Sequence, residues 1–222
     1  ARFGLPDERL HVIYNAVDAN VFSPALREHR ARIRAKYRIP EDAVLFLLVG
    51  SGFRRKGVPA AIEAIARLPA TAQLLVVGED RQLPAFKRLA REHGVRERVT
   101  FAGYQSDIGA CYGAADAFVL PAIYDAFPDA AMEALASGLP VITSDRTGAA
   151  ATWCCAGRGD QQVRAAVHLV HRRLADEVAA EPRRPQLFAA LAVPGTDLIV
   201  APGAQHETRL GDDDAVAHLR HA

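Results

Sequence analysis

Residues 44–57 read Val44-Leu45-Phe46-Leu47-Leu48-Val49-Gly50-Ser51-Gly52-Phe53-Arg54-Arg55-Lys56-Gly57, an apolar run that passes directly into a glycine-rich basic loop. The run is apolar on both faces, which is typical of a central parallel strand covered by helices on both sides. In the next segment, Val58–Leu68, apolar residues recur at helical spacing. The stretch therefore predicts a strand, a loop and a helix in succession.

The same alternation continues on both sides of this stretch, from about His11 to Thr143. The expected strands are His11–Tyr14, Ala43–Gly50, Gln73–Gly78, Arg98–Ala102, Ala117–Pro121 and Leu139–Thr143. The expected helices are Ala25–Tyr37, Val58–Leu68, Leu83–His93, Asp107–Ala115 and Asp129–Ser137. Strand–helix–strand units with short links imply right-handed crossovers. We therefore expect an α/β fold with an open parallel sheet and helices on both faces.

The pattern changes after about Trp153. Gln162–Ala180 predicts an amphipathic helix, residues 197–201 one further strand, and Asp213–His221 a terminal helix. We accordingly expect an α/β domain over residues 11–153 and a divergent, α-rich tail over residues 154–222.

The composition excludes several classes of protein. Lys and Arg total 27 against 26 for Asp and Glu, so the formal charge is only +1 and no nucleic-acid partner is expected. No apolar run approaches the roughly 20 residues that span a bilayer, and the first ten residues do not resemble a signal peptide. The chain has 3 cysteines, two of them adjacent, which favours a reducing, cytoplasmic location.

The loop Gly50–Gly57 is the first candidate site. Ligands of open parallel sheets bind outside the carboxyl ends of the strands, where this loop is expected. Its glycines allow close approach of the backbone, and Arg55 and Lys56 beside a helix N-terminus favour an anion such as phosphate. The spacing is that of neither a Walker A loop nor a GxGxxG loop. The alternative is a surface loop with solvated basic side chains.

A second loop carries carboxylates and follows the expected strand Ala117–Pro121. Pro128 suits the first turn of the following helix. Asp125 is then expected just before that helix and Glu133 about one turn inside it, with both carboxylates facing the same crevice as the basic loop. The alternative is that Asp125 or Asp129 caps the helix and that Glu133 is a solvated helical residue.

These loops match a known family in order and spacing. The matching segments are Val12–Asp18, Gly50–Gly57, Val76–Gly78, Val99–Gly103, Ala114–Asp116, Asp125–Glu133 and Glu133–Ile142. From about Val12 to Thr147 the chain resembles the C-terminal, donor-binding domain of retaining GT-B glycosyltransferases of family 4. Among these it is most similar to the lipopolysaccharide core glucosyltransferase I group. The resemblance implies a Rossmann-like domain, one half of a GT-B fold.

The resemblance also implies roles for single residues. Lys56, helped by Arg55, contacts the diphosphate of a nucleotide-sugar and stabilises the departing nucleoside diphosphate, which requires no metal or other cofactor. Asp125 and Glu133 match the two acidic residues of the family's E-x7-E motif, which lie against the donor sugar and the ribose. Tyr104 is expected near the base. The other expected donor contacts are Gly50, Ser51, Gly52, Gly78, Ala126, Phe127, Asp129 and Ala130.

Four positions depart from the family pattern. Asp125 is one methylene shorter than the usual Glu, so its carboxylate reaches less far. Pro128 replaces a glycine and removes one N–H, and Ala16 replaces the glycine of the family's Asn-Gly segment. Asp129 puts a carboxylate close to the expected phosphate, where two anions repel.

The implied function is the binding of a UDP-sugar such as UDP-glucose for retaining transfer to a lipopolysaccharide-core or other glycan hydroxyl. Residues 1–10 match the connection that follows the acceptor-binding domain in this family. We therefore expect the isolated chain to bind nucleotide weakly and to be inactive. The alternatives are a degenerate, non-catalytic nucleotide-binding module and a sugar-nucleotide epimerase.

One further segment bears on location. The basic cluster Arg30–Arg38 lies along an expected helix and is interpreted as a solvated face. The alternative is a peripheral contact with the anionic inner leaflet of a membrane.

Overall fold

The structure is a computed structural model that describes residues 15–148 and 198–201. Within these residues the strands are β1 (Val44–Val49), β2 (Ala72–Val77), β3 (Val99–Gly103), β4 (Ala117–Leu120), β5 (Val141–Ser144) and β6 (Leu198–Ala201). The helices are α1 (Arg30–Tyr37), α2 (Val58–Arg67), α3 (Leu83–Glu92), α4 (Ile108–Ala114) and α5 (Asp129–Ala136), with 3₁₀-helices η2 (Pro24–His29) and η3 (Arg96–Arg98). The strands and helices expected within the described residues are present with small shifts at their ends, except for the helix expected at Ala25–Tyr37.

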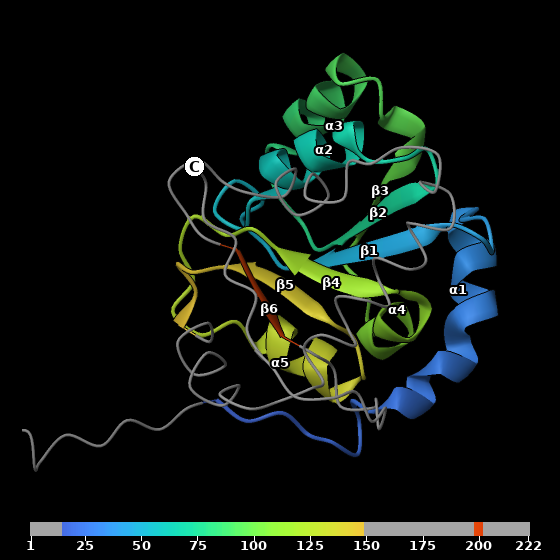
Figure 1. Cartoon of the computed structure of the whole chain (residues 1–222), viewed down its shortest axis with the longest axis vertical. Coiled ribbons are helices and arrows are strands. Elements are labelled where there is room, and N and C mark those ends of the chain that lie inside the picture. The colour runs from blue at the N-terminus through green and yellow to red at the C-terminus, as the bar shows by residue number, and fades with distance from the viewer. Residues whose placement is uncertain (1–14, 149–197, 202–222) are drawn as a thin grey trace, which may run out of the picture.

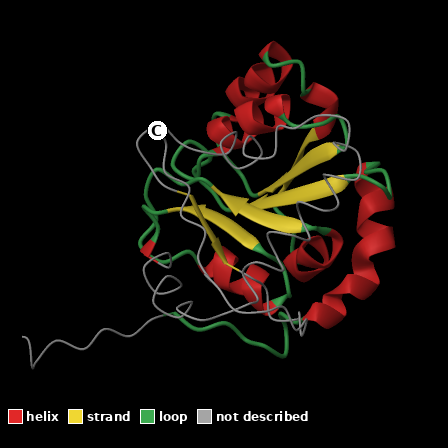
Figure 2. Cartoon of the chain, in the orientation of Figure 1, coloured by secondary structure: helices red, strands yellow, loops and turns green. Residues whose placement is uncertain are grey.

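The sheet has the strand order β3-β2-β1-β4-β5-β6, and the strands from β1 to β5 run parallel. Helices α2 and α3 cover one face of the sheet, and α4 and α5 cover the other (Figures 1 and 2). The expected open parallel sheet with helices on both faces is thus confirmed.

Strand β6 adds one antiparallel edge to this sheet. It pairs with β5 from Val141↔Ala201 to Ser144↔Leu198. A strand was expected at residues 197–201, but as part of a separate tail beside an all-parallel sheet. An antiparallel edge strand on an otherwise parallel sheet is common. Two antiparallel neighbours do not need the crossover connection that two parallel neighbours require.

The core lies on both faces of β1, as its continuous apolar sequence requires. Val44, Phe46 and Leu48 pack with α2 and α3, while Leu45 and Leu47 pack with α4 and α5. All five side chains are at most 2% exposed. Full burial of one such side chain contributes about 1.5–3 kcal/mol, so β1 anchors both layers.

The expected helix Ala25–Tyr37 is divided in two. Its first part is the 3₁₀-helix η2, which begins at Pro24, and only Arg30–Tyr37 is α-helical. Helix α4 lies so close to η2 that a Cβ added at Gly113 would be 1.8 Å from the carbonyl oxygen of Leu26. Glycine at this position therefore permits the contact between the two segments.

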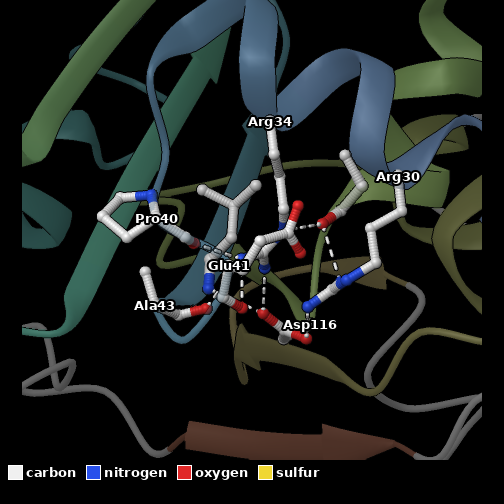
Figure 3. Close-up of polar contacts among 8 residues, drawn as sticks. Arg30, Arg34, Pro40, Glu41, Ala43 and Asp116 are labelled. Carbon is white, nitrogen blue, oxygen red and sulfur yellow. Dashed lines mark hydrogen bonds and ion pairs between the residues drawn. The ribbon is translucent and has the colours of Figure 1, made fainter.

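Two arginines of α1 turn inward at the amino ends of β1 and β4 (Figure 3). The guanidinium of Arg34 donates to Asp116 Oδ2 at 2.6 Å, and Arg30 donates to Asp116 Oδ1 at 3.0 Å. The remaining donors of Arg34 reach the backbone oxygens of Pro40, Glu41, Ala43 and Ala114. Burial lowers the pKa of Arg34, and the Asp116 carboxylate partly offsets this.

The interpretation of Arg30–Arg38 as a solvated face is therefore wrong for Arg30 and Arg34. Arg34 is 0% exposed and Arg30 is paired with the same carboxylate. Of the exposed basic residues, Arg32 pairs with Asp107 and Lys36 donates to Gln105. Two of the exposed cations of this cluster thus have partners within the protein, while Arg38 is exposed.

Several expectations fall outside the described residues. They are the strand His11–Tyr14, the connection at residues 1–10, the helix Gln162–Ala180 and the terminal helix Asp213–His221. In the part of the chain that the structure describes, no helix is both long and apolar enough to cross a membrane.

Candidate functional site

The strand order reverses between β1 and β4, which are neighbours in the sheet although two strands separate them in sequence. At such a switch point the loops after the two strands turn to opposite faces and leave a crevice at their carboxyl ends. Here the two loops are residues 50–57 after β1 and residues 121–128 after β4. The fold thus brings both candidate loops to the position where parallel sheets bind ligands.

A compact charged cluster joins the two loops. Lys56 Nζ lies 2.6 Å from Asp125 Oδ2, and Arg55 Nη1 lies 3.2 Å from the same oxygen. The side chains of Lys56 and Asp125 are 11% and 10% exposed, whereas that of Arg55 is 51% exposed. The expected convergence of these three residues is confirmed. The Arg55 side chain is half in solvent and also donates to the carbonyl oxygen of Tyr124, whereas Lys56 is buried between the two loops.

Close backbone contact fixes the two loops against each other. Gly57 has a φ of +79°, and a Cβ added there would lie 1.8 Å from the carbonyl oxygen of Pro121. The backbone N–H of Ile123 donates to the carbonyl oxygen of Arg55 at 2.9 Å. Since Lys56 lies between these contacts, its position relative to Asp125 is set by the backbone as well as by the ion pair.

The last residue of β5 and the segment after it hold the second loop in place. Ser144 Oγ donates to the carbonyl oxygen of Ala122 at 2.6 Å, and Asp125 forms an isolated parallel bridge with Thr147. Gly148 N donates to the carbonyl oxygen of Asp125 at 2.8 Å. A Cβ at Gly148 would lie 1.7 Å from the carbonyl oxygen of Ala126, so only glycine allows this approach. The backbone of Asp125 and of the residues on either side of it is thus held by the segment that follows β5.

Two glycines with positive φ allow the ends of β1 and β2 to pack closely beside Lys56. Gly50 and Gly78 end β1 and β2 with φ values of 141° and 130°. A Cβ at Gly78 would lie 2.2 Å from the carbonyl oxygen of Gly50, and one at Gly50 would lie 2.8 Å from Lys56 Cε. Ser51 and Gly52 are exposed at the tip of the loop. The glycines leave Lys56 the space that larger residues would occupy.

Glu133 lies on α5, and its described partners differ from those of the charged cluster. Its Oε2 accepts a hydrogen bond of 2.6 Å from the hydroxyl of Tyr112 on α4. No described residue joins it to Lys56 or Arg55. Burial, followed by the nearby Glu133 carboxylate, raises the pKa of the Tyr112 phenol well above its ordinary value. The four expected charged residues therefore form a cluster of three, and Glu133 stands apart from it.

The other expected contacts lie around the start of α5. Asp129 is exposed in the first turn, and its Oδ1 accepts a hydrogen bond of 2.7 Å from Asn15 Nδ2. Pro128 is the N-cap residue and makes no side-chain capping bond, so neither Asp125 nor Asp129 caps this helix. Ala126 is exposed, Phe127 and Ala130 are half-buried, and Tyr104 is 73% exposed on the loop after β3.

The contacts of three further side chains in this region were not predicted from the sequence. Tyr112 has the pattern of an ordinary core aromatic of a helix, and Asn15 lies 114 residues from its partner Asp129. Asp80, after β2, accepts from the backbone N–H of Phe53 at 2.7 Å and supports the first loop. Asp80 had one signal, its place at the carboxyl end of a strand. Asn15 lies in the family-matching segment Val12–Asp18, but nothing there indicated Asp129 as its partner, and no pattern indicated a role for Tyr112.

Comparison with known proteins places this chain in a family. The chain matches the family of Glycosyl transferases group 1 over residues 29–159. It is 39% identical over 127 residues to the lipopolysaccharide glucosyltransferase WaaG of Escherichia coli, a match that covers 55% of this chain and 34% of that relative. The chain thus spans about a third of the length of that curated relative.

Two solved structures have the same fold. The crystal structure of WaaG, a glycosyltransferase involved in lipopolysaccharide biosynthesis, matches with a TM-score of 0.63 and 29% identity, over 84% of this chain and 51% of that chain. The structure of Anabaena HepE in complex with UDP and glucose matches with a TM-score of 0.59 and 24% identity, over 67% of this chain and 41% of that chain. The family match and the fold agree with the resemblance carried by the two loops: the chain belongs to the group 1 glycosyl transferases.

Proposed function

We propose that this chain binds a nucleotide-sugar, a UDP-sugar such as UDP-glucose, for retaining transfer of a hexosyl group to a lipopolysaccharide-core or other glycan hydroxyl. The observation that carries the proposal is the Lys56–Asp125 pair, with Arg55 beside it, at the switch point between β1 and β4. A diphosphate bound in that crevice meets two cations. The relative named as a lipopolysaccharide glucosyltransferase and the fold relative that holds UDP and glucose support this choice.

In this proposal Lys56 and Arg55 bind the diphosphate. As the bond to the sugar breaks, negative charge builds up on the leaving diphosphate, and fixed cations stabilise that charge without a metal or another cofactor. Lys56 is the better anchored of the two, because it is buried and held by Asp125. Asp125 keeps the ammonium group oriented and lies toward the sugar.

The remaining contacts come from the backbone and from α5. Gly50 and Gly78 contact the diphosphate through their backbone, and Glu133 accepts hydrogen bonds from the ribose. Tyr104 is exposed and offers its ring to the base. The acceptor in this proposal is a glycan or lipid-linked hydroxyl.

Calorimetry with UDP tests the proposal. The wild-type chain is expected to bind UDP, and Lys56→Ala to weaken binding about 10–100-fold, because a charge-assisted bond to phosphate is lost. Glu133→Ala is expected to weaken it about tenfold. Lys87→Ala is the matched control, since Lys87 is an exposed lysine on α3. EDTA is expected to leave the affinity unchanged.

A degenerate nucleotide-binding module is the second candidate, and the Asn15–Asp129 bond favours it. That bond holds a carboxylate at the start of α5, close to where the proposal places phosphate. Absence of UDP binding at millimolar concentration would support this candidate against the donor site. We expect the isolated 222-residue chain to transfer no sugar; turnover by it would contradict that expectation.

A further inference from the structure

Tyr112 is a buried side chain for which the donor site as proposed has no use. It lies on α4 and is 0% exposed. Its ring packs edge-on against Phe22, with centroids 5.7 Å apart, and tilted against Phe118 at 6.2 Å. These contacts on two sides fix the plane of the ring, so its hydroxyl has a fixed position against α5.

The hydroxyl has one proton and two possible acceptors on α5. Glu133 Oε2 lies 2.6 Å away and the carbonyl oxygen of Ala130 lies 3.1 Å away. The shorter distance is that of a hydroxyl donating to a carboxylate, which is the stronger kind of hydrogen bond. The proton therefore goes to Glu133, and the described residues leave its Oε1 without a partner.

The phenol remains a donor throughout the ordinary pH range. Burial, assisted by the negative charge of Glu133, raises the pKa of Tyr112 well above its usual value. Glu133 itself is half-buried on a short helix, and without this bond its long side chain is free to sample several rotamers.

We propose that Tyr112 is the positioning residue for Glu133, holding one carboxylate oxygen so that the other is presented to a ribose hydroxyl. The inference rests on the proposed function, since it takes Glu133 to be the ribose ligand. A carboxylate already fixed in its binding rotamer loses less entropy when the ligand arrives. Tyr112 does not touch the ligand, and its effect is transmitted through Glu133 alone.

The test compares UDP with 2′-deoxy-UDP, which lacks one ribose hydroxyl. The wild-type chain is expected to prefer UDP about tenfold. Tyr112→Phe is expected to reduce this preference to about twofold, while its affinity for 2′-deoxy-UDP stays within about twofold of the wild-type value. If Tyr112 has a purely structural role, Tyr112→Phe would weaken the binding of UDP and of 2′-deoxy-UDP equally.

Two further variants complete the design. Tyr37→Phe is the matched control, because the Tyr37 hydroxyl is buried without a hydrogen-bond partner among the described residues; it is expected to keep the full preference. In a Glu133→Ala background, adding Tyr112→Phe is expected to change neither affinity. That background lacks the carboxylate, so any change in affinity there would show that Tyr112→Phe acts on binding by a route other than Glu133.

The outcomes separate the two levels of inference. If the wild-type chain binds UDP and Tyr112→Phe keeps the tenfold preference, the positioning role is overturned and the donor site stands. If Tyr112→Phe changes the preference equally with and without Glu133, the role through Glu133 is also overturned. If the wild-type chain does not bind UDP, the proposed function fails and the inference fails with it.

Discussion

The two ends of β1 and β4 carry clusters of the same kind. At the amino ends Arg34 and Arg30 share Asp116, and at the carboxyl ends Lys56 and Arg55 share Asp125. The shorter contact is 2.6 Å in both clusters. By distance alone they would be judged equivalent.

The two clusters differ in how many other hydrogen-bond acceptors their cationic side chains contact. The Arg34 guanidinium is enclosed by four backbone oxygens in addition to Asp116. Lys56 is bonded, among the described residues, only to Asp125, and Arg55 is half in solvent. A cation whose donors are all satisfied within the protein stabilises the fold, whereas one with spare donors at a switch point can bind an anion. Remaining hydrogen-bonding capacity is therefore a better guide to function than the ion pair itself.

Removing the carboxylate of the first cluster and the buried cation of the second should separate stability from binding. Asp116→Ala is expected to lower the free energy of unfolding by about 3–5 kcal/mol, because it leaves Arg34 buried without a counter-charge. Lys56→Ala also breaks a buried pair, but it is expected to lower the free energy of unfolding by only about 1–2 kcal/mol, since Arg55 still pairs with the Asp125 carboxylate. Urea unfolding measures both values. Equal losses of stability would show that the two clusters have the same structural role.

A substitution at the start of α5 should have a smaller effect on the affinity for UDP. Asp129→Ala is expected to increase the affinity for UDP about threefold, because it removes an exposed carboxylate near the proposed phosphate position. Calorimetry checks this, and Asp42→Ala, an exposed carboxylate beside the amino end of β1, is the control for net charge. A weaker affinity in Asp129→Ala would mean that the Asn15 bond organises the site instead of competing with it.

The exposed pair Arg32–Asp107 should give the smallest effect. The hydrogen bond from Arg32 lowers the pKa of Asp107, so the stability that this pair supplies is present above the ordinary carboxyl range and is lost as the pH falls below about 4. Asp107→Asn keeps a residue able to cap α4 and is expected to cost about 0.5 kcal/mol at pH 7. Melting curves at pH 7 and pH 3 test the sign: a cost that grows toward acid would contradict it.

How much the sequence could predict depended on the range of each interaction. The strands and helices follow local periodicity, and the meeting of Lys56, Arg55 and Asp125 follows from the rule that carboxyl ends of parallel strands lie at one edge. The burial of Arg34 depends on a carboxylate 82 residues away. The Tyr112–Glu133 bond likewise depends on how α4 and α5 pack, which periodicity does not determine. Sequence reasoning found the two loops but missed the burial of Arg34 and the contact of Tyr112 with Glu133.

Strand β6 has a consequence for anyone shortening this chain. A piece ending just after β5 would expose the N–H and C=O groups of Val141–Ser144 that now pair with Leu198–Ala201. Such an open edge is a template for a second molecule, and truncated chains would be prone to associate side by side into aggregates. Retaining residues 198–201, or placing a lysine on the outer edge of β5, is therefore the safer design for an expression trial.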